Sequence, residues 1–180
     1  MTRLSRLLQR AVRANAREAA RDLYDNADDD DASVGTSRVG FERATIPRLM
    51  RQANTFLDTL KWHRDKLTVY RTLRLKEGTT SLNRVWAQPL GVYWASGMGW
   101  WPGAGSGRIV TIRGRVLFSQ VNWDRTIFNV MYYDEGEIRI LEHEIIELTG
   151  VLVWHGESCG QAHWVPLMIT QTVGKRGDAW

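Results

Sequence analysis

The chain has 180 residues, enough for one ordinary domain with an appendage. With 43% apolar and 24% charged residues it has the composition of a globular protein, which excludes a disordered or fibrous chain. The formal net charge of +4, from 24 basic and 20 acidic residues, fits either a slightly basic surface or an affinity for an anionic partner.

We expect neither a membrane span nor a signal peptide in this sequence. Its apolar runs fall short of the roughly 18 to 20 residues that a bilayer requires, and arginines interrupt the leucines near the start of the chain. The single cysteine, Cys159, cannot form a disulfide within the chain. We therefore expect a cytoplasmic protein in a reducing compartment.

An amphipathic basic helix is predicted at residues 3–24. Apolar residues recur there at intervals of three and four, and six arginines occupy the other faces. Less the acidic Glu18 and Asp22, these arginines give the segment a charge of +4 (6 − 2 = 4). Such a helix suits a membrane surface, a nucleic acid or an acidic protein, or else it packs on the body of the protein. The arginines are Arg3, Arg6, Arg10, Arg13, Arg17 and Arg21.

An acidic linker at residues 25–40 is expected to separate this helix from a second one, because its aspartates repel one another and turn-forming residues follow them. The second helix is predicted at residues 45–63, with Thr45 as its N-cap and Pro47 close behind. Together these elements form a helical N-terminal region, residues 1–66.

A mostly β domain is predicted at residues 67–180, which makes the fold class α+β. Short runs of β-branched and aromatic residues alternate there with glycine and proline. Eight of the nine tryptophans follow residue 85, as expected for packing a small β core. The glycine-rich segment 97–107 lacks the lysine of a phosphate-binding loop, so we interpret it as an ordinary loop. The expected strands lie at 67–71, 91–94, 108–116, 144–146 and 151–154.

The histidines and the cysteine do not form a familiar site. The four histidines lie at positions 63, 143, 155 and 163, and these spacings match no common metal-ligand pattern. A nucleophile made from Cys159 with His155 or His163 finds no support in the neighbouring sequence. We expect no metal site.

Two glutamates open one of the expected strands. Glu142 and Glu144 are two residues apart, and residues with this spacing on a strand point to the same face of the sheet. Two carboxylates in one cleft suit acid-base work or the stabilisation of a developing positive charge. The same pattern is common on solvent-facing strand edges, so by itself it leaves both interpretations open.

The order of these motifs carries more information than any one of them. Tyr70 and Arg71 on a first strand precede the segment GlyValTyrTrpAlaSer at 91–96, a glycine-rich aromatic loop, two strand-like runs and then GluHisGlu at 142–144. This succession resembles the ADP-ribosyltransferase family, in its Arg/Ser/Glu toxin-like branch, and more closely the small versions from bacteriophage and prophage genomes. The resemblance covers about half of the chain and implies a compact, mostly antiparallel β-sandwich core.

The resemblance also implies an activity. The protein would be an NAD-dependent mono-ADP-ribosyltransferase that modifies a host protein, and arginine is the acceptor residue that we expect. Glu144 would be the catalytic glutamate that stabilises the cationic ribosyl centre, and Glu142 would orient the acceptor.

NAD, which is a substrate in this family, would be held by residues of the first two strands. Arg71 would bind the diphosphate through charge-assisted hydrogen bonds, and Ser96 would support the site. Tyr93 and Trp94 would offer flat rings to the nicotinamide.

Two alternatives belong to other functional classes. One is a catalytically inactive phage structural or host-interaction protein with the same fold, carried in the virion or acting in the host cytoplasm. The other is a nucleic-acid binder that uses the arginine-rich N-terminal helix. In the inactive protein Glu142 and Glu144 would not matter for function, whereas nucleic-acid binding is compatible with either of the other two functions.

Overall fold

The protein is described here by a computed structural model, which covers residues 3–27, 37–75, 90–98, 108–155 and 161–173. The predicted α+β class is confirmed, because the described residues form three α-helices and an antiparallel sheet. The chain divides into two compact units. The helical unit comprises residues 1–59 and 123–137, and the sheet unit comprises residues 60–122 and 138–180.

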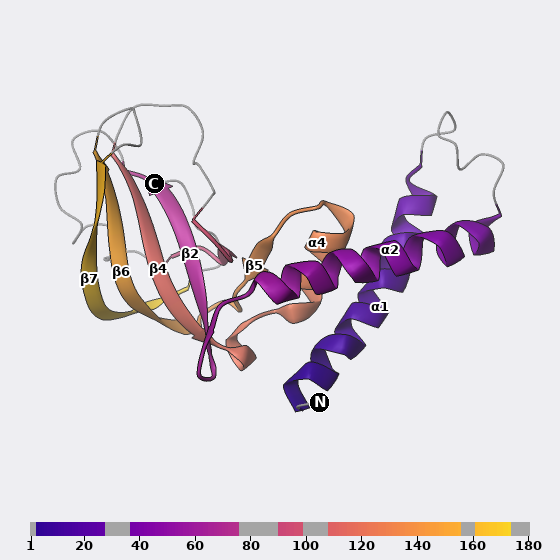
Figure 1. Cartoon of the computed structure of the whole chain (residues 1–180), viewed down its shortest axis with the longest axis horizontal. Coiled ribbons are helices and arrows are strands. Elements are labelled where there is room, and N and C mark those ends of the chain that lie inside the picture. The colour runs from indigo at the N-terminus through magenta and orange to yellow at the C-terminus, as the bar shows by residue number, and fades with distance from the viewer. Residues whose placement is uncertain (1–2, 28–36, 76–89, 99–107, 156–160, 174–180) are drawn as a thin grey trace. The chain divides into compact units, whose positions relative to one another are not determined.

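The first helix, α1 (Arg3–Asp25), agrees closely with the prediction. Its small apolar residues form the buried face, with Val12, Ala16, Ala19 and Ala20 fully buried. This face packs within the helical unit, where α1 contacts both α2 (Arg38–Thr59) and α4 (Trp123–Tyr132) (Figure 1).

The second helix, α2, is longer at its start than predicted. It begins at Arg38, and the Oγ atom of Ser37 accepts a hydrogen bond of 3.3 Å from the backbone nitrogen of Gly40, as an N-cap does. The prediction that Thr45 caps the helix is wrong, because Thr45 is buried within it and Pro47 lies in its interior. The helix also ends at Thr59, four residues before the predicted end (63 − 59 = 4).

The third helix, α4, comes from a part of the chain that the sequence assigned to the β domain. Six of its ten residues are buried. It forms hydrogen bonds with both other helices. Nδ2 of Asn15 in α1 donates to Oδ1 of Asp124 at 3.4 Å. Nε2 of Gln52 in α2 donates to the carbonyl oxygen of Val130 at 2.7 Å. The helical unit is therefore assembled from two separate stretches of sequence.

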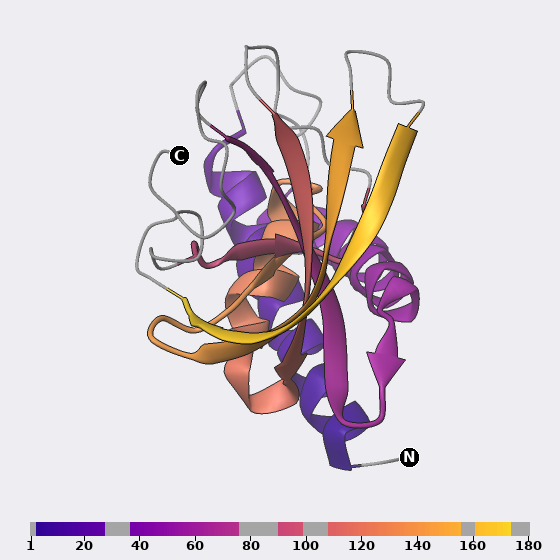
Figure 2. The ribbon, with the colours of Figure 1, turned by 90° about the vertical axis from the view of Figure 1, so that its left-hand side faces the viewer.

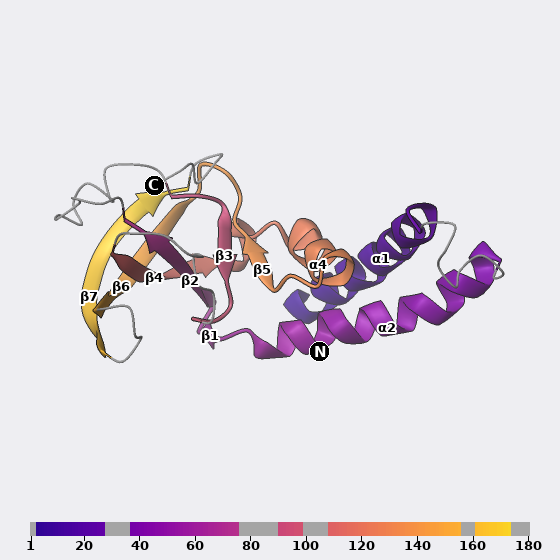
Figure 3. The ribbon, with the colours of Figure 1, turned by 90° about the horizontal axis from the view of Figure 1, so that it is seen from above.

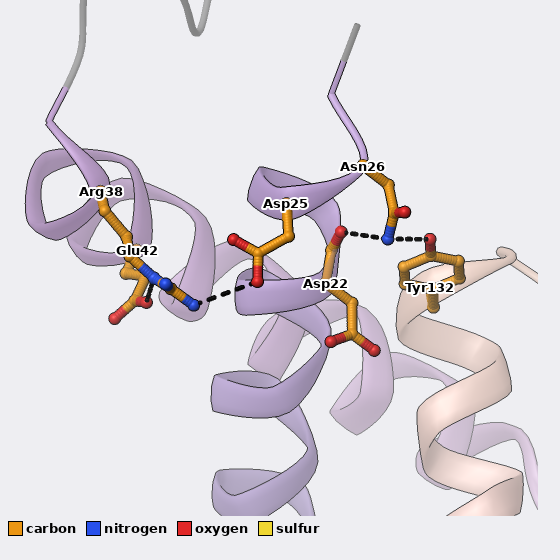
Figure 4. Close-up of polar contacts among 6 residues, drawn as sticks. All are labelled: Asp22, Asp25, Asn26, Arg38, Glu42 and Tyr132. Atoms are coloured by element: carbon orange, nitrogen blue, oxygen red, sulfur yellow. Dashed lines mark hydrogen bonds and ion pairs between the residues drawn. The ribbon is translucent and has the colours of Figure 1, made fainter.

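Polar contacts join the three helices where α1 ends (Figure 4). The Nδ2 atom of Asn26 donates both to the carbonyl oxygen of Asp22, at 2.7 Å, and to the hydroxyl of Tyr132 in α4, at 3.3 Å. Arg38 at the start of α2 forms an ion pair of 3.3 Å with Asp25 of α1. These contacts fix the end of α1 against its two neighbours.

The strands of the sheet unit form one sheet, in the order β5-β3-β2-β4-β6-β7, with β1 paired to β2 (Figures 2 and 3). The predicted β-sandwich of two sheets is therefore not what these strands form. The long strands lie side by side with a strong twist (Figure 2). The bounds are β1 Trp62–His63, β2 Lys66–Arg74, β3 Tyr93–Ala95, β4 Ile109–Leu117, β5 Glu137–Arg139, β6 Ile145–His155 and β7 Gln161–Thr172.

One face of this sheet forms the core of the unit. Val69, Ile112 and Val151 are fully buried there. Gly114 lies next to the indole of Trp94, and a Cβ atom at Gly114 would make an ordinary contact of 3.5 Å with that ring. Trp94 itself is only 2% exposed. We call this side of the sheet the core face and the opposite side the outer face.

Two differences from the predicted strands concern the end of the chain. The predicted strands at 144–146 and 151–154 are one strand, β6, which continues through Gly150 with an irregular register between Leu148 and Gly150. The strand β7 was not predicted individually.

No helix in the described parts of the chain is both long and apolar enough to cross a bilayer.

Candidate functional site

The structure places Arg71 on the core face of β2. It follows Val69 and precedes Leu73 in the alternation of buried residues, and it pairs with Ile112 of β4. The side chain is half-buried, and its Nη1 atom donates a 3.0 Å hydrogen bond to the carbonyl oxygen of Tyr93. Arg71 and Tyr93, two predicted NAD-binding residues, are thus in contact.

The neighbouring aromatic residues of β3 point to opposite faces. Trp94 is buried, and its Nε1 atom donates a 2.8 Å hydrogen bond to the carbonyl oxygen of Gly91, so its ring packs the core. Tyr93 is 44% exposed, and the guanidinium of Arg139 lies 5.3 Å from its ring centroid. Ser96 follows β3 in a bend and is half-buried.

The two predicted catalytic glutamates do not lie on a strand. Glu142 and His143 form a turn, and β6 begins only at Ile145. His143 has a φ of 65°, a left-handed conformation that breaks the alternation of an extended chain. The argument that Glu142 and Glu144 share a face because they are two apart on a strand is therefore wrong.

Glu144 has its own partners, away from Arg71 in the sheet. Its Oε2 atom accepts a 3.1 Å hydrogen bond from Nε2 of Gln120. In the register of the sheet, Arg71 is level with Ile112 and so with Val151, which is seven residues beyond Glu144 (151 − 144 = 7). The six steps from Ile145 to Val151, which lie within β6, cover about 20 Å along the strand. The predicted site residues thus form two groups, Arg71 with Tyr93 and Glu144 with Gln120.

Other candidates from the sequence are outside what can be described. Cys159 and most of the glycine-rich segment 97–107 lie outside the described residues, as do the side chains of His155 and His163. Over the parts of the chain that are described, no group of three or more His, Cys, Asp or Glu side chains could hold a metal ion.

The strongest charged feature is a row of arginines along α1, which we call the arginine row. Its five members fall within about 80° of one another around the helix, and they extend over about 22 Å of its length. All five are exposed, whereas the opposite side of the helix is buried. Glu18 and Asp22 lie roughly 60° and 100° beyond the edge of the row. Its members are Arg6, Arg10, Arg13, Arg17 and Arg21.

The arginine row differs from Arg38, which two carboxylates neutralise. Arg38 pairs with Asp25 at 3.3 Å and with Glu42 at 3.1 Å (Figure 4). Among the residues that the structure describes, no carboxylate forms an ion pair with any member of the row. The positive charge of α1 is therefore available to a partner. The periodicity of the sequence had placed these arginines on the polar side of the helix, but it could not show that no described carboxylate pairs with them.

One carboxyl of the sheet unit has a shifted pKa. The hydrogen bond from Lys66, whose Nζ atom lies 2.7 Å from Oε2 of Glu147, lowers the pKa of Glu147, and the charges of Lys66, Arg115 and His63 lower it further. Both side chains of this pair remain about 40% exposed. The pair neutralises the positive charge of Lys66 on the outer face.

Comparisons of the chain with protein-family models, with curated proteins and with solved structures gave no match.

Proposed function

We propose that this protein binds nucleic acid through the arginine row of α1. The observation that carries the proposal is that five exposed arginines share one helical face and have no acidic partner among the described residues. Guanidinium groups bind phosphate oxygens through paired, charge-assisted hydrogen bonds. A row that repeats every 5 to 6 Å, roughly one turn of helix, matches a polymer with regularly repeated negative charge.

The packing of α1 favours a polyanion over a membrane surface. An amphipathic helix binds a bilayer by inserting its apolar face into the lipid. The apolar face of α1, with Val12, Ala16 and Ala19, is instead buried within the helical unit. The arginine face of this helix is open, and electrostatic attraction to phosphates requires nothing more.

Counterion release gives the direct test, because each phosphate contact contributes about 0.7 to 0.9 to the slope of log affinity against log salt. Five contacts predict a slope of about −3.5 to −4.5 for a labelled oligonucleotide titrated at several salt concentrations. Replacing Arg10, Arg13 and Arg17 by Gln should reduce the magnitude of that slope by about 2 to 3. Glutamine is a good helix former, so α1 should be retained, as circular dichroism can verify.

A charge-matched control comes from α2, where Arg43, Arg48 and Arg51 are also exposed but are spread over an arc of about 140°. Replacing these three by Gln removes the same net charge and should change the slope much less. Equal effects of the two triple variants, or a wild-type slope near zero, would contradict the proposal. Tight binding of an acidic polypeptide in place of the oligonucleotide would identify the partner as a protein.

A second candidate is the NAD-dependent ADP-ribosyltransferase that the sequence resembles. It is supported by the hydrogen bond from Arg71 to the carbonyl oxygen of Tyr93, which joins two of the residues expected to hold NAD. A guanidinium suits a diphosphate, and an exposed ring such as that of Tyr93 suits a flat heterocycle. In that case labelled NAD should transfer to a protein, with arginine expected as acceptor, and Glu144→Gln should abolish the transfer while the circular dichroism stays unchanged. Absence of both NAD binding and nicotinamide release from the wild type would rule it out.

A further inference from the structure

The outer face of the sheet carries aromatic rings and arginines side by side. Tyr70 of β2 pairs with Arg113 of β4 and with Ala95 of β3, and residues paired across strands share a face. Tyr93 lies two residues before Ala95, so it is on the same face as Tyr70. This is the side opposite to the buried Val69 and Ile112.

The guanidinium of Arg113 lies over the ring of Trp164. Its guanidinium carbon lies 4.7 Å from the ring centroid, and its Nε atom donates a 3.0 Å hydrogen bond to Oγ1 of Thr149. Gly150 makes this arrangement fit, since a Cβ atom there would lie 3.1 Å from Nη2 of Arg113 and 3.2 Å from Trp164. The glycine therefore lets an arginine and a tryptophan from different strands meet over the backbone of β6.

The same pairing of an arginine with a ring occurs on this face near the opposite edge of the sheet. Arg139 lies 5.3 Å from the ring centroid of Tyr93, which is 44% exposed. Trp164 is 36% exposed. Together with Tyr70, these two arginine–ring pairs form what we call the aromatic–arginine face, made up of Tyr70, Tyr93, Arg113, Arg139 and Trp164.

We propose that the aromatic–arginine face is a second binding surface, specific for unpaired bases, and that the nucleic acid bound by this protein is single-stranded. The proposal rests on the proposed nucleic-acid binding and adds the class of nucleic acid to it. Single-stranded nucleic acids are bound where bases stack on aromatic rings or guanidinium planes next to positive charge. The positive charge of Arg113 and Arg139 complements the phosphates, which argues for a nucleic acid over an uncharged ligand with a flat face.

Unpaired bases fit this surface better than a duplex. The bases of a duplex are stacked on one another, and their flat faces are inaccessible to a protein ring. Rings spread over several strands of one sheet face, by contrast, can stack on bases that are splayed along a single nucleic-acid strand. Stacking of this kind tolerates any base, so we expect little sequence specificity.

The test compares three labelled probes, each about 20 nucleotides long: an oligothymidylate, an abasic strand with the same phosphates, and a duplex. The wild type should bind the oligothymidylate more tightly than either of the others at the same salt concentration. Replacing Trp164 by Ala should weaken oligothymidylate binding about 5- to 100-fold, the loss expected for one stacked base, and leave the salt dependence unchanged.

Trp62→Ala is the matched control. Trp62 is 40% exposed, close to the value for Trp164, but it pairs with Leu67 and therefore lies on the side of the core face. Its removal should leave oligothymidylate binding unchanged. Tyr93→Leu provides a second variant on the aromatic–arginine face in case Trp164→Ala fails to fold, and it should also reduce the preference for bases.

The outcomes separate this inference from the proposed function. Steep salt dependence with equal affinity for oligothymidylate and the abasic strand would overturn the inference and leave the arginine row in place. Equal losses in Trp62→Ala and Trp164→Ala, or duplex binding at least as tight as that of the oligothymidylate, would also overturn it. Absence of salt-dependent binding to all three probes would overturn both.

Discussion

The arginines of α1 and those of the sheet are set in opposite surroundings. In α1 the five members of the arginine row point to solvent, and within the described residues neither a carboxylate nor an aromatic ring accompanies them. In the sheet, Arg113 and Arg139 each lie against a ring. A mobile, hydrated charge attracts any polyanion and is screened by salt, whereas a ring with a fixed guanidinium offers a flat surface that salt hardly affects. The two regions are thus suited to different chemical groups, phosphates in α1 and flat bases on the sheet.

The largest effect should come from replacing Trp94, the buried tryptophan that packs on the core face of the sheet. Replacing this buried ring by Ala should lower the free energy of unfolding by about 3 to 5 kcal/mol, because it leaves a cavity beside Gly114. Tyr93→Ala, on the exposed side of the same strand, should cost about 1 kcal/mol or less. Urea denaturation followed by circular dichroism measures both. If the rings of β3 contribute equally to stability, the distinction between core face and outer face is wrong.

Removing a single charge should affect binding differently in the arginine row and at Arg38, which two carboxylates neutralise. Arg13→Gln removes one phosphate contact, which lowers the magnitude of the salt slope by about 0.9 and the affinity about eightfold near 0.1 M salt. Arg38→Gln removes the same charge, but Asp25 and Glu42 already neutralise Arg38. It should leave the salt slope nearly unchanged. Titration of an oligonucleotide at several salt concentrations measures the difference, and equal slopes for the two variants would show that net charge alone controls binding.

The helical unit shows which elements the sequence could predict. The helix α1 was predictable because its apolar residues repeat with the helical period and its arginines mark the solvent side. The helix α4 was not, because six of its ten residues are buried and the polar face is too narrow to reveal a period. Thr45 and Pro47 imitate a helix start, yet α2 continues through both of them. Local signals therefore failed where tertiary packing on other elements decided the structure.

The sheet shows the same limit for functional residues. His143 has a left-handed conformation although it is not a glycine, so the sequence gives no sign of it. This conformation removes the basis for placing Glu142 and Glu144 on one face. The strand β7 contains Pro166, which usually breaks a strand, but β7 lies at the edge of the sheet, where proline is tolerated. The aromatic–arginine face draws on five strands, and its composition depends on their pairing, which the sequence does not state.

Gly150 is the place to disturb the aromatic–arginine face with a single methyl group. In Gly150→Ala the new Cβ atom would lie 3.1 Å from Arg113 and 3.2 Å from Trp164, so at least one of them must move. We expect a stability loss of about 1 kcal/mol and a reduced preference for oligothymidylate over the abasic strand. The salt slope should stay at the wild-type value. A variant that keeps its full preference for bases would show that the contact between Arg113 and Trp164 is not needed for stacking.

The smallest effect concerns Lys66 of the sheet, whose charge Glu147 neutralises. Its hydrogen bond lowers the pKa of Glu147 in the folded protein, so the pair stabilises the fold above the ordinary carboxyl pKa, and this contribution is lost as the pH falls through the lowered value. Because both side chains are about 40% exposed, the contribution should be under 1 kcal/mol, roughly the value of a surface ion pair. Glu147→Gln should therefore cost this small amount at neutral pH and nothing at a pH well below the lowered pKa of Glu147, where the wild type has lost it as well. The same variant frees the charge of Lys66 on the outer face, which should tighten oligonucleotide binding slightly and steepen the salt slope by less than about 0.9. Titration of both proteins by urea at several pH values, with binding measured at neutral pH, tests the two expectations together. A stability difference that persists at low pH would show that Glu147 acts through something other than its charge.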